Sequence, residues 1–160
     1  LPRIPIVEKY ETFTEISKIG RNLSELHVNF ENAEEYPITF NEGDLRLLYI
    51  ENPDTFFKVE KMKFINKTNK SLIAYNNNLT INNIPLEAYE YKVNGKSAIE
   101  WIMERQSIKL DQKSSITNDV NNYAIETKQD PSYPLKLLAR IITISLETKK
   151  LVNNLPPLNI

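Results

Sequence analysis

The chain has 160 residues, no cysteine and 20 basic against 21 acidic side chains, which gives a formal net charge of −1 at pH 7. This length favours a single domain, residues 1–160, with one hydrophobic core. The composition excludes disulfides and thiolate metal sites, and no apolar run is long enough to span a bilayer, so we expect a cytoplasmic protein. Because the first residue is Leu1 rather than Met, we expect the chain to be a fragment of a longer polypeptide.

The charges are unevenly distributed along the chain. Residues 1–57 carry 5 basic and 11 acidic side chains, residues 58–113 carry 10 and 6, and residues 114–160 carry 5 and 4. A basic middle segment is typical of a surface that binds a polyanion. Scattered, solvated lysines would give the same counts, so the charge pattern leaves both interpretations open.

The first predicted element is an amphipathic helix over residues 6–30. Apolar side chains recur there at steps of three and four positions, as on one face of a helix. Pro5 suits the start of such a helix, and acidic side chains in its early turns suit the helix dipole. We expect this helix to end before Pro37 and to pack through its apolar stripe.

Residues 44–93 have the pattern of short strands separated by turns. In the last of them, Tyr89, Tyr91 and Val93 alternate with charged residues, which predicts a strand with one buried face. The candidate strands are DLRLLYI at 44–50, FFKVEKMKFI at 56–65 with a break near Glu60–Lys61, SLIAY at 71–75, LTI at 79–81 and AYEYKV at 88–93.

The segment VNGKSAIEWIMERQ at 93–106 joins a strand to a helix. Ser97 stands three residues before Glu100, the spacing of a capping box at a helix N-terminus. The preceding Asn94–Gly95 pair also fits a hairpin turn. The capping box favours the strand-to-helix interpretation, with a short helix beginning at Ser97.

A polar segment, 111–132, precedes the last predicted helix, which begins near Tyr133–Pro134 and stops before Pro156–Pro157. The predicted fold class is therefore α+β. It consists of a short-stranded, mostly antiparallel sheet region with one internal helix, bracketed by two long amphipathic terminal helices.

The sequence contains no convincing catalytic or metal-binding pattern. His27, the single histidine, has no ligand or catalytic partner nearby in the sequence, and none of the three glycines begins a phosphate-binding loop. Asp54 with Glu90 and Lys92 imitates the layout of a Mg²⁺-dependent nuclease. Acid-x-Lys triplets arise readily by chance in so lysine-rich a chain, so the nuclease interpretation ranks last.

The basic middle segment supplies the candidate binding residues, because lysines attract phosphates while amide and phenol side chains contact bases or backbone. Most asparagines in such positions are turn residues. The candidate phosphate ligands are Lys58, Lys61, Lys63, Lys67, Lys70, Lys92 and Lys96. From a wider set that also contains Asn77 and Asn122, we select Asn76, Asn78, Asn118, Asn121 and Tyr123 as the candidate DNA contacts.

Several stretches together resemble the C-terminal region of type ISP restriction-modification enzymes. The likeness runs in order along nearly the whole chain. The matching stretches are RIPIVE at 3–8, GRNLSELHVNFE at 20–31, VEKMKF at 59–64, IPLEAYEYKVNGKSAIEWIMERQSIK at 84–109, ITNDVNNYA at 116–124 and ITISLETKKLVNNLP at 142–156.

This resemblance implies a target recognition domain that binds double-stranded DNA and performs no catalysis itself. The adenine-N6 methyltransferase, the helicase-like ATPase and the nuclease would lie upstream in the same polypeptide and would use S-adenosylmethionine, ATP and Mg²⁺. No cofactor is expected in this domain. The alternative is a docking module whose terminal helices brace the methyltransferase domain without reading bases.

Overall fold

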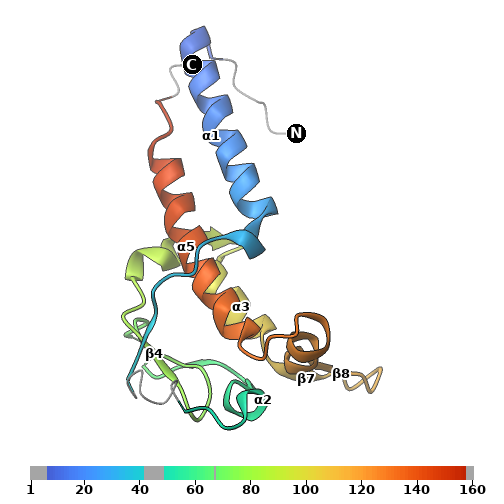
Figure 1. Ribbon diagram of the computed structural model, residues 1–160. Helices are drawn as coiled ribbons and strands as arrows, with labels where there is room; N and C mark the ends of the chain where they lie inside the picture. Colours follow the sequence, from blue (N-terminus) through green and yellow to red (C-terminus); the bar gives the residue numbers. More distant parts are fainter. Residues whose placement is uncertain (1–6, 42–48, 67, 158–160) are drawn as a thin grey trace.

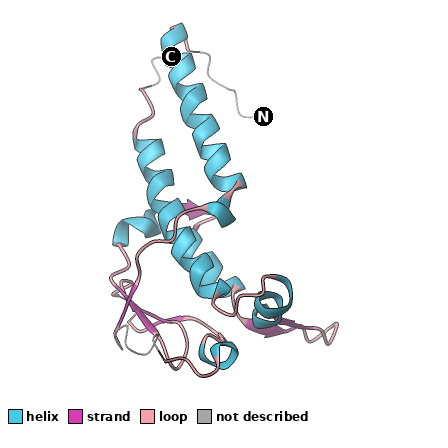
Figure 2. Ribbon diagram, in the orientation of Figure 1, coloured by secondary structure: helices cyan, strands magenta, loops and turns pink. Residues whose placement is uncertain are grey.

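The computed structural model describes residues 7–41, 49–66 and 68–157 (Figure 1). Figure 2 shows two long helices at one end and most of the short strands at the other. In chain order the elements are α1 (Tyr10–Val28), η1 (Phe30–Asn32), β1 (Thr39–Phe40), α2 (Pro53–Phe56), β2 (Lys63–Phe64), β3 (Ile73–Ala74), β4 (Thr80–Asn82), η3 (Leu86–Glu90), β5 (Lys92–Val93), β6 (Lys96–Ser97), α3 (Ala98–Arg105), β7 (Ile108–Leu110), β8 (Thr117–Asp119), α4 (Val120–Asn122), η4 (Tyr123–Thr127) and α5 (Tyr133–Asn153).

The main sheet has the strand order β1-β4-β3-β2, and all its pairings are antiparallel. Ile73 stands opposite Ile81, and both side chains are completely buried. The antiparallel expectation is therefore confirmed, although each strand has only two or three residues. Of the candidate strand 44–50, residues 44–48 lie outside the described part, and Tyr49 and Ile50 are not in a strand.

The predicted strand 56–65 is mostly wrong. Phe56 ends the short helix α2, and only Lys63–Phe64 pairs with a neighbouring strand. The expected break near Glu60–Lys61 is present, because Lys61 forms an isolated bridge with Ser107 instead of joining the main sheet. Asn52 caps α2 by accepting a hydrogen bond from the Thr55 N–H, which favours a helical turn over a strand here.

Helix α5 is the centre of the core, and its start at Tyr133 confirms the predicted start of the last helix. It begins with Pro134 in its first turn, a position where proline costs no helical hydrogen bond. Leu138, Ile142 and Ile144 are almost completely buried. The helix contacts α1, α3 and η3, so residues distant in sequence share one apolar core.

Helix α1 packs less than its stripe predicts. Among its residues only Ile19 is buried, whereas Tyr10 is 77% and Phe13 is 58% exposed. Figure 1 shows α1 and α5 side by side, extending together away from the main sheet. The outer half of α1 therefore presents apolar side chains to solvent.

The predicted strand 88–93 is also wrong over most of its length. A 3₁₀ turn, η3, occupies Leu86–Glu90, and only Lys92–Val93 forms a strand. Tyr89 is buried and its hydroxyl donates to the Lys70 carbonyl at 2.7 Å, whereas Val93 is 41% exposed. The 3₁₀ turn buries the neighbouring residues Ala88 and Tyr89 together, so the alternation of a strand is absent here.

Both interpretations of the 93–106 segment are correct. Asn94 and Gly95 have φ values of 52° and 80° and form the two-residue turn of the β5–β6 hairpin. Helix α3 follows immediately, with Ser97 as its N-cap. The Ser97 hydroxyl accepts from the Glu100 N–H at 3.2 Å, and the Glu100 carboxylate accepts from the Ser97 N–H at 3.1 Å, which confirms the capping box.

Candidate nucleic-acid interface

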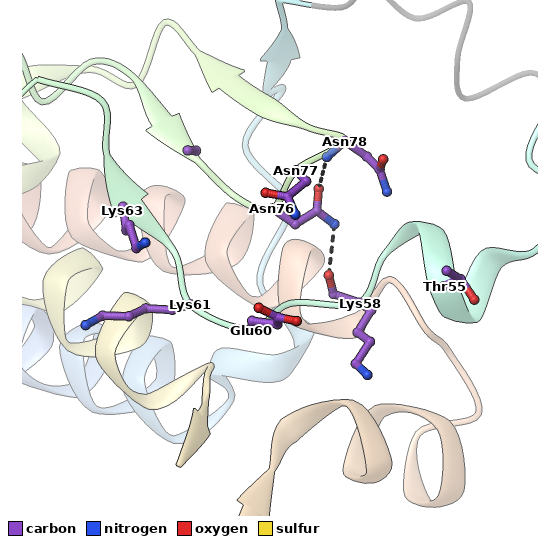
Figure 3. A pocket seen from close by; sticks show the side chains of 9 residues that line it. Thr55, Lys58, Glu60, Lys61, Lys63, Asn76, Asn77 and Asn78 are labelled. Carbon is purple, nitrogen blue, oxygen red and sulfur yellow. Dashed lines mark hydrogen bonds between the residues drawn. The ribbon is translucent and has the colours of Figure 1, made fainter.

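A polar groove of about 370 Å³ lies at the end of the molecule that carries the main sheet. Its lining comes from α2, from the segment that leads into β2, from β3 and from the turn between β3 and β4 (Figure 3). The lining residues are Thr55, Lys58, Glu60, Lys61, Lys63, Ala74, Asn76, Asn77 and Asn78.

The backbone on one side of the groove is held by side chains from β3 and its turn. The Asn76 amide donates to the carbonyls of Phe56 and Lys58 at 2.8 and 2.9 Å, and the Tyr75 hydroxyl donates to the Phe57 carbonyl at 2.8 Å. Three consecutive carbonyls, of Phe56, Phe57 and Lys58, thus accept hydrogen bonds from side chains, although this segment forms no strand. This network fixes the point at which the Lys58 side chain leaves the backbone.

Asn121 holds the next residue of the same segment, Val59. Its side-chain oxygen accepts from the Val59 N–H, and its amide donates to the Val59 carbonyl, both at 2.9 Å. The amide also donates to Asp119 at 2.7 Å, and Asn121 is buried. The Asn121 side chain therefore imitates a neighbouring strand and stabilises the groove from within.

Three of the candidate lysines surround the groove with unpaired charges. Lys58, Lys61 and Lys63 are exposed, and within the described residues none of them forms an ion pair. Figure 3 shows Lys61 and Lys63 on one side of Glu60 and Lys58 on the other. Such cations can neutralise phosphates without first breaking an internal salt bridge.

Two other candidate lysines are engaged by carboxylates. The Lys70 ammonium lies 2.9 Å from a Glu100 oxygen and over the rings of Phe64 and Tyr89. Lys96 pairs with Glu104 and lies over the Trp101 ring, 4.5 Å from its centroid. These contacts link elements of the fold and leave less charge for an external anion.

One further described candidate, Lys92, does not line the groove. Lys92 is exposed on β5 and has no ion pair in the part of the chain that the structure describes. Lys67 lies outside the described residues. Of the six candidate lysines in the described residues, the structure therefore gathers three at one groove.

The candidate side chains for base contacts also separate into two kinds. Asn76 and Asn121 use their amides on the protein backbone, and the Asn78 amide donates to the Phe56 carbonyl at 3.2 Å. Asn118 is exposed on β8, and Tyr123 is 47% exposed with its ring edge against Tyr133. Neither Asn118 nor Tyr123 lines the groove.

Glu100 links the capping box to Lys70. Burial raises its pKa, but hydrogen bonds from Ser97 and Lys70 outweigh that effect and lower the pKa to about 2. The carboxylate is therefore charged at neutral pH and fixes Lys70 beside the aromatic rings. This arrangement stabilises the start of α3.

The structure supports no metal centre at the residues of the nuclease alternative. Within residues 7–41, 49–66 and 68–157, no three His, Cys, Asp or Glu side chains gather as metal ligands would. Glu90 instead pairs with Lys149 of α5 at 2.7 Å. No helix in these ranges is long and apolar enough to cross a membrane.

Comparisons with solved structures relate the whole fold to proteins in complex with DNA or a DNA substrate mimic. A nuclease-deletion mutant of the Type ISP restriction-modification enzyme LlaGI, in complex with a DNA substrate mimic, is 40% identical with a TM-score of 0.81 over 100% of this chain. The ATP-dependent Type ISP enzyme LlaBIII bound to DNA is 39% identical with the same TM-score over 100% of this chain. A DrdV–DNA complex is 25% identical with a TM-score of 0.69 over 99% of this chain.

This chain covers only 12%, 10% and 15% of those three solved chains. No curated protein sequence matches it. The family model of the Type ISP C-terminal specificity domain matches residues 1–137. The match confirms the family that the sequence stretches indicate, and the chain belongs to the Type ISP C-terminal specificity domain family.

Proposed function

We propose that this chain recognises the DNA target of a single-chain restriction-modification polypeptide. The observation that carries the proposal is the groove with three unpaired lysines, Lys58, Lys61 and Lys63, on a rigid backbone. Solved relatives with the same fold are bound to DNA, which supports duplex DNA as the ligand.

In this proposal the chain performs no catalysis itself. The adenine-N6 methyltransferase, the ATP-dependent translocase and the nuclease belong to other parts of the polypeptide and use S-adenosylmethionine, ATP and Mg²⁺ there. The small share of the solved Type ISP chains that this domain covers leaves room for those parts. The complete protein would act in the cytoplasm, where its DNA substrate is found.

The proposal is tested by the salt dependence of duplex binding. Each phosphate contact contributes about 0.9 to the slope of log affinity against log salt. Replacing Lys58, Lys61 and Lys63 with Ala should therefore reduce the slope by up to about 2.7. Fluorescence anisotropy with a labelled duplex at several salt concentrations measures this change.

A matched control removes three cations from α1 and its N-cap, away from the groove. Lys9→Ala, Lys18→Ala and Arg21→Ala together lower the net charge by the same amount. The control should keep the wild-type slope to within about one unit, because only long-range attraction is changed. Equal slopes for the groove variant and the wild type would contradict the proposed interface.

A second candidate function is docking by the terminal helices. It is favoured by the exposure of Tyr10 and Phe13 on the same face of α1. Reversing the charges of Lys61 and Lys63 in the complete polypeptide separates the two candidates. Loss of DNA binding with an unchanged melting temperature favours target recognition, whereas a lower interdomain stability favours docking.

A further inference from the structure

The turn between β3 and β4 consists of three consecutive asparagines with different environments. Asn76 is fully occupied: its amide donates to two carbonyls, and its side-chain oxygen accepts from the N–H groups of Asn78 and Leu79 at 2.8 and 2.9 Å. Both donors and both acceptor positions of this amide are used. Asn76 therefore builds the turn and cannot contact a base without dismantling it.

Asn77 differs from its two neighbours. Its side chain is exposed, and no hydrogen bond or ion pair joins it to any other described residue. It nevertheless lines the groove with Lys61 and Lys63 (Figure 3). An amide donor and an amide acceptor are thus both available at the groove wall.

The backbone of Asn77 is held firmly on both sides. The Tyr75 N–H donates to the Leu79 carbonyl at 3.0 Å, and the Asn78 amide donates to the Phe56 carbonyl. The turn is therefore closed at Leu79, just before β4, and anchored to the end of α2. A side chain presented from an anchored turn loses little conformational entropy on binding, apart from its own rotamers.

The chemistry of a free carboxamide selects one base among four. In the major groove adenine offers the N6 amino donor beside the N7 acceptor, which complements the paired acceptor and donor of Asn. Guanine offers two acceptors at the same edge, so only one of the two hydrogen bonds would form. Unpaired lysines beside the amide would hold the flanking phosphates and fix its register.

We propose that Asn77 determines specificity by pairing with the adenine of one A·T base pair in the target. This inference rests on the proposed function and adds to it a residue that recognises a base. In this proposal Asn77 contacts a base, whereas Lys58, Lys61 and Lys63 contact the phosphates of the DNA backbone.

The test selects bound duplexes from a random library with the complete polypeptide that carries this chain. Wild type, Asn77→Ala and Asn77→Asp are compared, and Asn22→Ala serves as a control with an exposed asparagine on α1. Asn77→Asp keeps the size of the side chain but removes the amide donor. The turn should be preserved, because the Asn77 side chain forms no hydrogen bond with another described residue. The melting temperature of each variant checks the fold.

We expect the wild-type consensus to contain one A·T position whose preference falls about 5-fold to about 150-fold in both Asn77 variants. All other positions, and the Asn22→Ala consensus, should remain unchanged. An unaltered consensus in both Asn77 variants overturns this inference and leaves the proposed function intact. Uniform weakening at every position also overturns it, since that result identifies a backbone contact. If the wild type enriches no sequence, the proposed function fails and this inference fails with it.

Discussion

The Glu100 carboxylate connects a local helix signal with a long-range ion pair, and its removal should change the pH dependence of stability. One oxygen accepts from the Ser97 N–H and hydroxyl at 3.1 and 2.6 Å, and the other accepts from Lys70 at 2.9 Å. The Glu100 side chain is 26% exposed. Glu100→Gln keeps the shape and removes the charge.

The size of the effect follows from the pKa of Glu100, which falls from 4.5 to about 2 on folding. At about 1.4 kcal/mol per pKa unit, the charged carboxylate contributes about 3 kcal/mol to the free energy of unfolding. Because the folded pKa is the lower one, this stability is complete above pH 4.5 and is lost as the pH falls through about 2. About half of it should be lost by pH 3.

Urea unfolding followed by circular dichroism between pH 3 and pH 7 measures the prediction. Glu100→Gln should be up to about 3 kcal/mol less stable than the wild type at pH 7, and the difference should stay nearly constant down to about pH 4.5 and shrink from there toward pH 3. Glu87→Gln on η3, exposed and without an ion pair among the described residues, controls for the loss of one charge. A difference between wild type and Glu100→Gln that stays constant with pH would refute the assignment.

Three further variants test other parts of the fold. Asn121→Ala should destabilise the chain by about 2–4 kcal/mol in urea unfolding, because it leaves the N–H and carbonyl of buried Val59 without partners; an effect below about 1 kcal/mol would contradict that role. Gly95→Ala should lower the free energy of unfolding by about 1 kcal/mol, because a side chain is strained at a φ of 80° while the added Cβ meets no atom within 4 Å; a much larger loss would indicate a steric clash. Tyr10→Ser with Phe13→Ser should leave the melting temperature of the chain within about 2 °C, as expected for exposed positions, and a marked decrease would show that these rings already pack.

Several elements could be predicted from the sequence because their causes lie within a few residues. The period of apolar residues identifies α5, and Pro134 marks its first turn. The three-residue spacing of Ser97 and Glu100 identifies the start of α3. In contrast, the alternation at 88–93 misidentifies a 3₁₀ turn, since Tyr89 is buried through a contact with Lys70, 19 positions earlier.

The sequence by itself determined the family, the α+β class and the basic character of the middle segment, because these follow from motifs, periodicity and composition. Only the tertiary structure decided which polar side chains remain available. Lys70 is neutralised by a carboxylate 30 positions away, and the Asn76 and Asn121 amides are used on backbone groups 18 to 62 positions away. Hydrogen bonds and ion pairs over such separations depend on how the chain folds back on itself, and no local pattern encodes them.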